Sequence, residues 1–268
     1  MTDINFSAKA TAYERDSLVQ KAASVELLNL LSIQEQESVQ DLGCGTGVTT
    51  GEIARITQGA VVGIDVSPGM IKEAVARNKD LPNISFRALD ATEIDYSEQF
   101  DVIYCNSAFQ WFSKPDQVLT RCRQALKANG RIGVQAPATS HYCPNFLAAV
   151  RKVQEHPDTG EIFSHFQSPW FFGESKEEYI QLFENCGLQV VYCEIKDDIK
   201  HFSTDQTYQI FQSGAENGYL NQDFYAVPIT SAYIETFRRL VKESIQEQVN
   251  QSCLVELLFV RVYLIARK

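Results

Sequence analysis

The stretch SVQDLGCGTG, residues 38–47, begins as a β-leaning run, reaches Asp41 and then places three glycines within five positions. Residues 48–56 have the pattern of a helix that begins directly after the glycines. Glycine permits positive φ and lets the backbone approach a ligand closely, because no Cβ is in the way. The stretch therefore predicts a strand, a loop and a helix, in which the loop is either a tight turn or a ligand-binding loop.

The same alternation of short β-rich runs and helical stretches continues to about residue 137. It indicates right-handed crossovers and a parallel sheet that is covered by helices on both faces. The strands are expected at 38–42, 60–65, 83–90, 100–106 and 131–137, and the helices at 48–56, 68–79 and 115–127.

The pattern changes after residue 137. Residues 138–172 are mixed in character and rich in aromatic side chains. A helix that ends at Gly187, a strand at about 188–199, two or more helices in 203–250 (the clearest at 229–249) and a last strand at 254–267 are expected after them. No linker or repeat interrupts the chain, so we expect one domain over residues 1–268.

Composition and charge limit the classes of function. The 268 residues have a net charge of −10, which argues against nucleic acid as a partner because phosphate binding favours a basic surface. No apolar run approaches the roughly 20 residues that span a bilayer, and the N-terminus has no signal-peptide pattern. Seven scattered cysteines indicate reduced thiols, and four histidines lack metal-ligand spacing. We therefore expect a cytoplasmic protein that acts on a small molecule without a metal.

The acid beside the glycine loop distinguishes two classes of ligand. A dinucleotide-binding loop has the spacing GxGxxG and holds a pyrophosphate at the helix N-terminus. This loop has the spacing GxGxG and is preceded by Asp41. An anionic side chain there repels a pyrophosphate and attracts a cationic group, so the loop favours a ligand with an ammonium group over a nicotinamide dinucleotide.

Two further acids stand where later strands end. Asp65 can accept hydrogen bonds from ribose hydroxyls, and Asp90, followed by Ala91, can accept one from the amino group of adenine. Val66 and Met70 offer apolar surface to the adenine ring. Because the carboxyl ends of parallel strands meet at one edge, these acids and the acid of the glycine loop are expected to form one cleft.

Four segments in this order, VQDLGCGTG, VVGIDVSPGMIKEA, ALDAT and FDVIYCNSAFQWF, resemble the S-adenosylmethionine-dependent methyltransferases of the Rossmann-like class. The resemblance covers at least residues 38–137. It implies an α/β fold with a seven-stranded, mostly parallel sheet, helices on both faces and an antiparallel last strand, and it implies S-adenosylmethionine as the cofactor. It places Asp41, Gly43, Cys44, Gly45, Gly47, Asn106 and Ala108 around the methionine part, Asp65 on the ribose, and Val66, Met70, Asp90 and Ala91 around the adenine.

Other segments resemble one branch of that class. FSAKATAYERDSLVQKAASVELLNLL and NSAFQWF resemble the malonyl-carrier-protein carboxyl O-methyltransferases and the trans-aconitate methyltransferases. SPWFFGESKEEYIQLFENCGL and LFVRVYLIARK resemble the trans-aconitate type. In that branch an N-terminal segment, here about 1–30, folds over the cofactor, and Tyr13 matches the aromatic residue that closes the pocket, with Phe6 beside it.

The chemistry of methyl transfer limits the acceptor. Transfer from a sulfonium is an in-line displacement that needs proximity, alignment and desolvation. A carboxylate is already ionised at pH 7 and needs no general base. His141 is the one candidate base in a plausible loop. We therefore expect carboxyl O-methylation, with N- or C-methylation of a small metabolite, methylation of a malonyl carrier protein and non-catalytic cofactor binding as the alternatives.

The candidates for the acceptor side lie after the fourth strand and in the C-terminal half. Gln110 and Trp111 stand where the loop after that strand faces the methyl group, and Trp170 either lines a pocket or belongs to a core. Arg261, in the last strand, is a candidate cation for a carboxylate. The helical insertion at about 200–250 is expected to cover the cleft as a lid and to favour a small closed acceptor site.

Overall fold

Seven strands form one sheet in the order β3-β2-β1-β4-β5-β7-β6 in the computed structural model, which describes residues 18–268. The strands are β1 (Val39–Leu42), β2 (Val61–Asp65), β3 (Ile84–Ala88), β4 (Phe100–Asn106), β5 (Leu126–Pro137), β6 (Gln189–Phe202) and β7 (Val255–Arg267). Neighbours among β1 to β5 pair in parallel, and β7 runs antiparallel to both β5 and β6. The expected fold class, a mostly parallel sheet with an antiparallel last strand, is confirmed.

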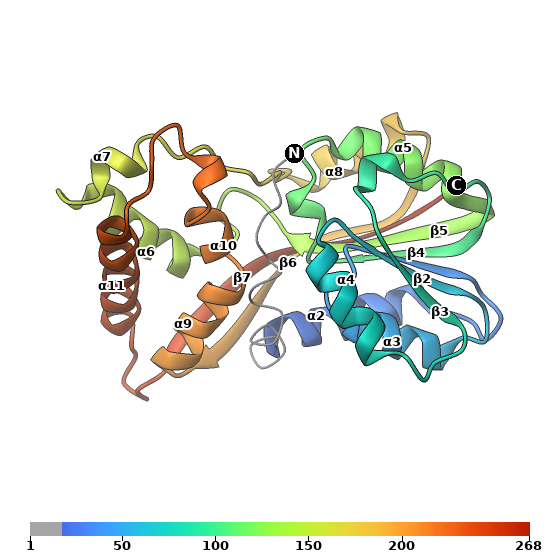
Figure 1. The fold of residues 1–268 in the computed structure, drawn as a ribbon, viewed down its shortest axis with the longest axis horizontal. Helices are drawn as coiled ribbons and strands as arrows, with labels where there is room; N and C mark the ends of the chain where they lie inside the picture. The colour runs from blue at the N-terminus through green and yellow to red at the C-terminus, as the bar shows by residue number, and fades with distance from the viewer. Residues whose placement is uncertain (1–17) are drawn as a thin grey trace.

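Helices cover both faces of this sheet (Figure 1). One face carries α2 (Leu18–Leu31), α3 (Val48–Ile56) and α4 (Pro68–Arg77), and the other carries α5 (Pro115–Ala125) and α8 (Lys176–Asn185). Pro68 and Pro115 stand in the first turn of their helices, where the missing proline N–H breaks no intrahelical bond. Ser175 Oγ accepts a hydrogen bond from the Glu178 N–H (3.2 Å) and caps α8.

The central strands are buried on both faces. Val102 and Tyr104 of β4 pack in one cluster with Leu27 of α2, whereas Ile103 and Cys105 pack in another with side chains of α5 and α8. Removing this apolar area from water is the main favourable contribution to the free energy of folding. Since helices cover both faces, the carboxyl edge of the strands is where polar groups can meet a ligand.

A second group of helices lies to one side of the sheet (Figure 1). This helical lobe (residues 144–163 and 204–247) consists of α6 (Pro144–Glu155), α7 (Gly160–Phe163), α9 (Thr204–Ser213), α10 (Glu216–Tyr219) and α11 (Ser231–Glu247). It has its own core, in which Phe146 and Phe211 pack edge to face with ring centroids 5.2 Å apart. Beyond the end of β5, β6 and β7 continue as a two-stranded ribbon into this lobe.

The structure differs from the expected elements in two respects. The helices between the last two strands are present, but α6 and α7 join them from a separate segment, which the sequence did not indicate. The strand expected at 131–137 begins earlier, at Leu126, so Asn129-Gly130, a pair typical of turns, is an irregularity within β5, which shifts register against β4. Asn129 has φ +64° there, a conformation that asparagine adopts more readily than most residues.

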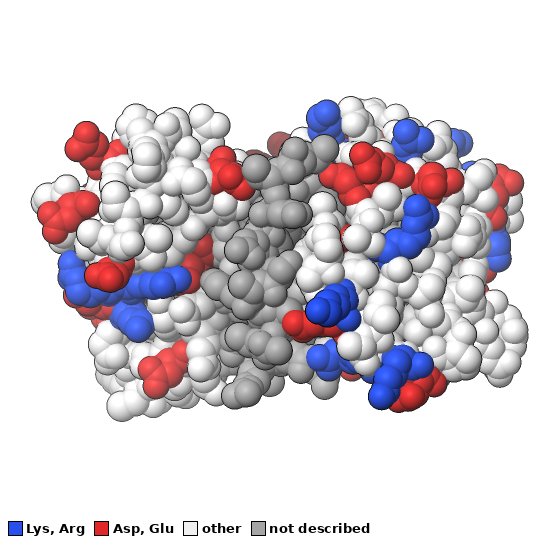
Figure 2. Space-filling model, viewed as in Figure 1, with Lys and Arg blue, Asp and Glu red and all other residues white. Residues whose placement is uncertain are grey.

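Neither a membrane-spanning helix nor a metal-binding cluster of side chains is found within residues 18–268. No helix within residues 18–268 is long and apolar enough to cross a membrane. Over the same residues no group of three or more His, Cys, Asp or Glu could hold a metal ion, and all seven cysteines are free. On the face in Figure 2, lysines and arginines are interspersed with acidic side chains on both sides of the molecule.

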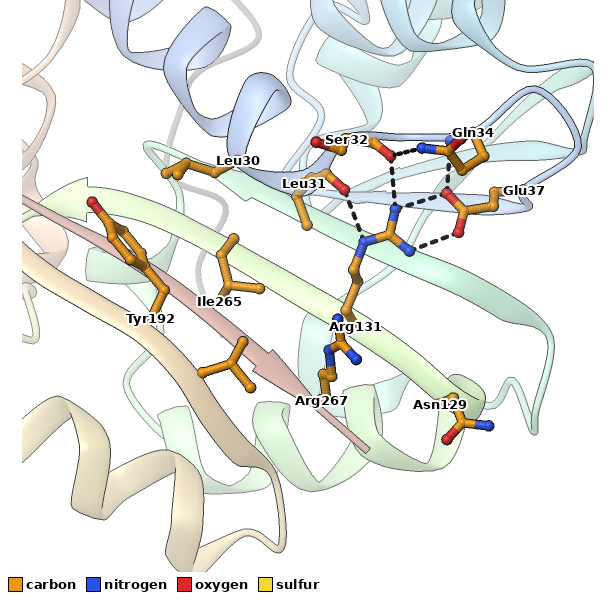
Figure 3. Close-up of a pocket in the computed structure, with 11 residues that line it drawn as sticks. Leu30, Leu31, Ser32, Gln34, Glu37, Asn129, Arg131, Tyr192, Ile265 and Arg267 are labelled. Carbon is orange, nitrogen blue, oxygen red and sulfur yellow. Dashed lines mark hydrogen bonds and ion pairs between the residues drawn. The ribbon is translucent and has the colours of Figure 1, made fainter.

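An ion pair fixes the end of α2 at the amino edge of the sheet (Figure 3). Arg131 of β5 binds both carboxylate oxygens of Glu37 at 2.6 and 2.7 Å and donates to the Leu31 carbonyl at 2.9 Å. These residues line a groove of about 500 Å³ that also includes Tyr192 and Arg267. The groove lies at the opposite edge of the sheet from the carboxyl ends of β1 and β4, so it is not part of the site described next.

Candidate functional site

The loop after β1 lies against the end of β2. The N–H groups of Gly43 and Cys44 both donate to the Ile64 carbonyl at 2.9 Å. The Asp65 carboxylate accepts a hydrogen bond from the Gly45 N–H (3.0 Å) through Oδ2 and one from the Ser67 N–H (2.9 Å) through Oδ1. The glycine loop is therefore held in place by the acid that the sequence analysis assigned to a ribose.

Two of the glycines are required for different reasons. A Cβ on Gly43, which has φ +77°, would lie 2.3 Å from the Ala108 Cβ, so only glycine lets the loops after β1 and β4 touch. Gly45 has φ +52°, yet nothing lies within 4 Å of the place where its Cβ would be. Space is therefore open beside Gly45, on the loop that the sequence analysis assigned to the methionine part of a ligand.

Asp41 is buried beneath the loop, with 2% of its surface exposed. Its Oδ2 accepts a hydrogen bond from Thr50 Oγ1 at 2.6 Å. The pKa of Asp41 is raised from its ordinary value to about 7, chiefly by burial and to a smaller extent by the nearby Asp65 carboxylate, while the hydrogen bond from Thr50 lowers it. No lysine or arginine within residues 18–268 forms an ion pair with Asp41, so a cationic ligand group would stabilise its ionised form.

The expected adenine side is assembled in part. Val66 follows Asp65 and is 46% exposed, an unusual position for a large apolar side chain. Met70 is only 3% exposed, so it can offer little surface to a ring. Asp90 caps a short helix, η2 (Ala91–Glu93), by accepting from the Thr92 N–H and Oγ1 at 2.8 and 2.7 Å. Both bonds are accepted by Asp90 Oδ1, so Asp90 Oδ2 takes part in neither of them.

A row of polar side chains crosses one face of the sheet. The strand register places on that face Asp41 of β1, Asn106 of β4, Gln135 of β5, Arg261 of β7 and Asp198 of β6. We call these five residues the polar row. It runs from the glycine loop towards the helical lobe and joins Asn106 and Arg261, which the sequence analysis assigned to the cofactor side and the acceptor side.

Arg261 is the buried cation of the polar row, with 4% of its surface exposed. Its Nε forms an ion pair with Asp198 Oδ2 at 3.6 Å, beyond hydrogen-bond distance, and has no hydrogen-bond partner. The guanidinium lies over the Phe259 ring, 4.9 Å from its centroid. Burial lowers the pKa of Arg261 below its ordinary value, since desolvation disfavours the cation. Asp198 offsets part of that cost, and a further anionic group that bound the guanidinium would offset more of it.

The other acceptor-side candidates are brought together at the short helix η3 (Phe109–Trp111). Trp111 packs edge to face on Trp170, with ring centroids 5.6 Å apart, and the Phe171 N–H donates to the Gln110 carbonyl (2.8 Å). Gln110 is 8% exposed, and its side-chain Oε1 has no hydrogen-bond partner. Trp170 also packs against Tyr219 of the helical lobe, 4.9 Å away, so it belongs to that core as well.

One of the expected site residues within residues 18–268, His141, forms no hydrogen bond or ion pair with the others. His141 is exposed, and its Nδ1 lies 3.2 Å from Ser140 Oγ, with no hydrogen bond or ion pair to any residue of the cleft over residues 18–268. Tyr13 and Phe6 lie outside the described residues. Gln135 was missed by the sequence analysis, where the one available signal was a glutamine within the apolar run 132–138.

The chain matches known proteins over this same region. A family described as "Methyltransferase domain" matches residues 33–212. The trans-aconitate 2-methyltransferase of Deinococcus radiodurans is 34% identical over 136 residues, which cover 50% of this chain and 51% of that protein. The malonyl-acyl-carrier-protein O-methyltransferase of Acetivibrio thermocellus is 32% identical over 130 residues, which cover 47% and 46%. The matches thus span about half the length of these two relatives.

A solved structure extends the likeness to nearly the whole chain. Phosphoethanolamine N-methyltransferase 2 of Haemonchus contortus, in complex with S-adenosyl-L-methionine, superposes with a TM-score of 0.59 at 15% identity. The match covers 98% of this chain and 57% of that one. At this identity the likeness concerns the fold, which agrees with the Rossmann-like topology described above.

The raised pKa of Asp41 predicts a stability change with pH. The ligand-free native protein holds a proton that the unfolded chain releases near pH 4, so the free energy of unfolding falls as pH rises from about 4 to 7. Asp41→Asn keeps an acceptor for Thr50 and carries no charge. At pH 8 its free energy of unfolding should exceed that of the wild type by a few kcal/mol. At pH 5 this difference in the free energy of unfolding should be smaller.

Chemical denaturation at the two pH values measures this difference. Asp80→Asn, a change at an exposed acid, is the control and should follow the wild type at both pH values. Parallel pH dependence of the wild type and Asp41→Asn would show that the pKa of Asp41 is not raised.

Proposed function

The chain belongs to the methyltransferase domain family, and from this premise we propose that it transfers a methyl group from S-adenosylmethionine to a carboxylate of a small molecule. The observation that carries the choice of acceptor is Arg261, a guanidinium that is 4% exposed and has an unsatisfied Nε. It lies in the polar row that begins beside the glycine loop. A buried cation with an incomplete set of partners is suited to bind an anionic substrate group.

The residues at the carboxyl edge fit S-adenosylmethionine. Open space lies beside Gly45, and Asp41 has no cationic partner among residues 18–268 to pair with, which suits the ammonium of a methionine moiety. Each Asp65 oxygen accepts one backbone hydrogen bond and retains a lone pair for a ribose hydroxyl. Val66 offers exposed apolar surface for an adenine ring. The remaining residues that would hold the cofactor are Gly43, Cys44, Gly47, Asp90, Ala91, Asn106 and Ala108.

In the proposed reaction, catalysis comes from positioning the acceptor carboxylate against the methyl group. When bound, S-adenosylmethionine supplies a methyl group activated by the sulfonium. An acceptor carboxylate is ionised at neutral pH, so the chain needs no general base, which agrees with the exposed position of His141. Arg261 would orient the carboxylate, and Trp111 and Trp170 would exclude water from the reacting groups.

The helical lobe favours a small acceptor. Trp170 connects Trp111, next to the cleft, with Tyr219 in the lobe core. We infer that the lobe covers the acceptor end of the cleft as a lid. A carrier-protein acceptor is acidic and would be repelled by a chain of net charge −10, and on the face in Figure 2 acidic side chains lie among the basic ones. A tri- or dicarboxylate such as trans-aconitate, named by one relative, is the acceptor class that we propose.

Asp65→Ala tests the cofactor side. The change removes the carboxylate proposed for the ribose, and each charge-assisted hydrogen bond contributes roughly 1.5–3 kcal/mol. Calorimetry should therefore show about 10- to 100-fold weaker binding of S-adenosylhomocysteine. Asp95→Ala, at an exposed acid that pairs with Arg87, is the control and should bind like the wild type. Equal affinity of the wild type and Asp65→Ala would contradict the assignment.

Arg261→Met tests the acceptor side. Removing the guanidinium should lower kcat/KM for trans-aconitate by about 10- to 100-fold, chiefly through KM, because a charge-assisted hydrogen bond is lost. Arg261→Lys keeps the charge and should lose less activity. Arg239→Met removes an exposed arginine from α11, which pairs with Glu243 on the same helix, and should leave kcat/KM unchanged. If Arg261→Met behaves like Arg239→Met, the carboxylate anchor lies elsewhere.

A further inference from the structure

Gln135 lies at the centre of the polar row. It is fully buried, and only one orientation of its amide gives both ends a complementary partner. In that orientation Oε1 accepts from Arg261 Nη1 at 3.1 Å. The Nε2 group donates to Asn106 Oδ1 at 2.8 Å and to Ser107 Oγ at 3.2 Å. One side chain thus joins the guanidinium proposed for the acceptor to the turn that follows β4.

The turn after β4 is held in an unusual conformation. Ser107 has φ +57°, a left-handed conformation that non-glycine residues adopt at a cost. Its N–H donates to the Gln135 carbonyl (2.8 Å), and its own carbonyl accepts from Gln110 Nε2 (2.9 Å). Together with the hydrogen bond from Gln135 Nε2 to Ser107 Oγ, the bond to the Gln135 carbonyl gives two hydrogen bonds between Gln135 and Ser107. Asn106 and Ala108 flank the strained residue, so Gln135 fixes the position of both.

The chemistry at this position requires a carboxamide. A glutamate would accept from Arg261 but could not donate to Asn106, and a lysine or arginine would repel Arg261. Since Asn106 Oδ1 is taken by Gln135, Asn106 Nδ2 is the end left to donate to a ligand. A donor there suits the carboxylate of the methionine moiety of the cofactor.

We propose that Gln135 is a positioning residue that couples the acceptor anchor Arg261 to the cofactor-binding turn 106–108. Arg261 fixes the orientation of the Gln135 amide, and the amide in turn fixes Asn106 as a hydrogen-bond donor. This inference rests on the proposed function, because it takes Arg261 as the acceptor anchor and Asn106 as a cofactor contact. It predicts that a change at Arg261 affects cofactor affinity through Gln135.

Binding of S-adenosylhomocysteine to single and double variants, measured by calorimetry, tests the coupling without an acceptor. Gln135→Met should weaken binding by about tenfold, since one hydrogen bond to the cofactor is lost with the orientation of Asn106. Arg261→Met should weaken it by about three- to tenfold. The double variant should bind no more weakly than Gln135→Met alone, because the second change acts through the first. Multiplied effects in the double variant would overturn the proposal.

The chain offers a matched control in Gln40 of β1. It is also a fully buried glutamine, on the opposite face of the sheet, and neither its Oε1 nor its Nε2 has a hydrogen-bond partner. Gln40→Met should therefore leave affinity for S-adenosylhomocysteine unchanged. If Gln135→Met binds as Gln40→Met does, Gln135 is structural only and the proposal fails.

A second variant covers the case in which Gln135→Met does not fold. Gln135→Glu can still accept from Arg261 but has no donor for Asn106, so it should fold, as followed by chemical denaturation, and bind about tenfold more weakly. Wild-type affinity in Gln135→Glu would overturn the proposal. Failure of the wild type itself to bind S-adenosylhomocysteine would instead remove the proposed function, and this inference with it.

Discussion

The contact between the loops after β1 and β4, at Gly43 and Ala108, is the constraint on which the rest of the site depends. A Cβ on Gly43 would lie 2.3 Å from the Ala108 Cβ, so the two loops touch only because residue 43 is glycine. The contact sets the loop where Asp65 can accept from the Gly45 N–H. It also places the loop beside Asn106, so that the ends of three strands form one cleft.

Two buried charges at this cleft have incomplete sets of partners. Burial raises the pKa of Asp41 to about 7 and lowers that of Arg261, so the ligand-free protein disfavours both charged forms. Burying an ion without a full set of partners costs several kcal/mol. On the proposed function, a cofactor with an ammonium and an acceptor with a carboxylate would offset the two costs. The same residues would then reduce stability in the free protein and provide affinity in the complex.

Much of the fold could be predicted because its signals are local. The glycine loop, the proline at the start of α4 and the glycine after α8 depend on the conformations of single residues. The acids at strand ends were placed correctly for the same reason, since Asp41, Asp65 and Asp90 all reach the carboxyl edge. Val66 and Met70 looked equivalent in sequence, but tertiary packing leaves one exposed and buries the other.

The rest depends on contacts between distant segments. α6 packs against α11, which no pattern within residues 144–155 could indicate. The role of Gln135 depends on Arg261 in another strand, and a glutamine in an apolar run gives no sign of its partner. The Asn-Gly pair near residue 130 is typical of a turn, yet it lies within β5 because the residues on either side, Leu126 and Arg131, both pair with β4.

Incubation of the protein with trans-aconitate and S-adenosylmethionine labelled in its methyl group, followed by mild base, shows whether a carboxylate receives the methyl group. Label should pass to a product from which base releases it as methanol, because methyl esters hydrolyse under these conditions. Label in a base-stable product would contradict carboxyl methylation. No transfer to trans-aconitate or to other small carboxylates offered with it would contradict the proposed acceptor class.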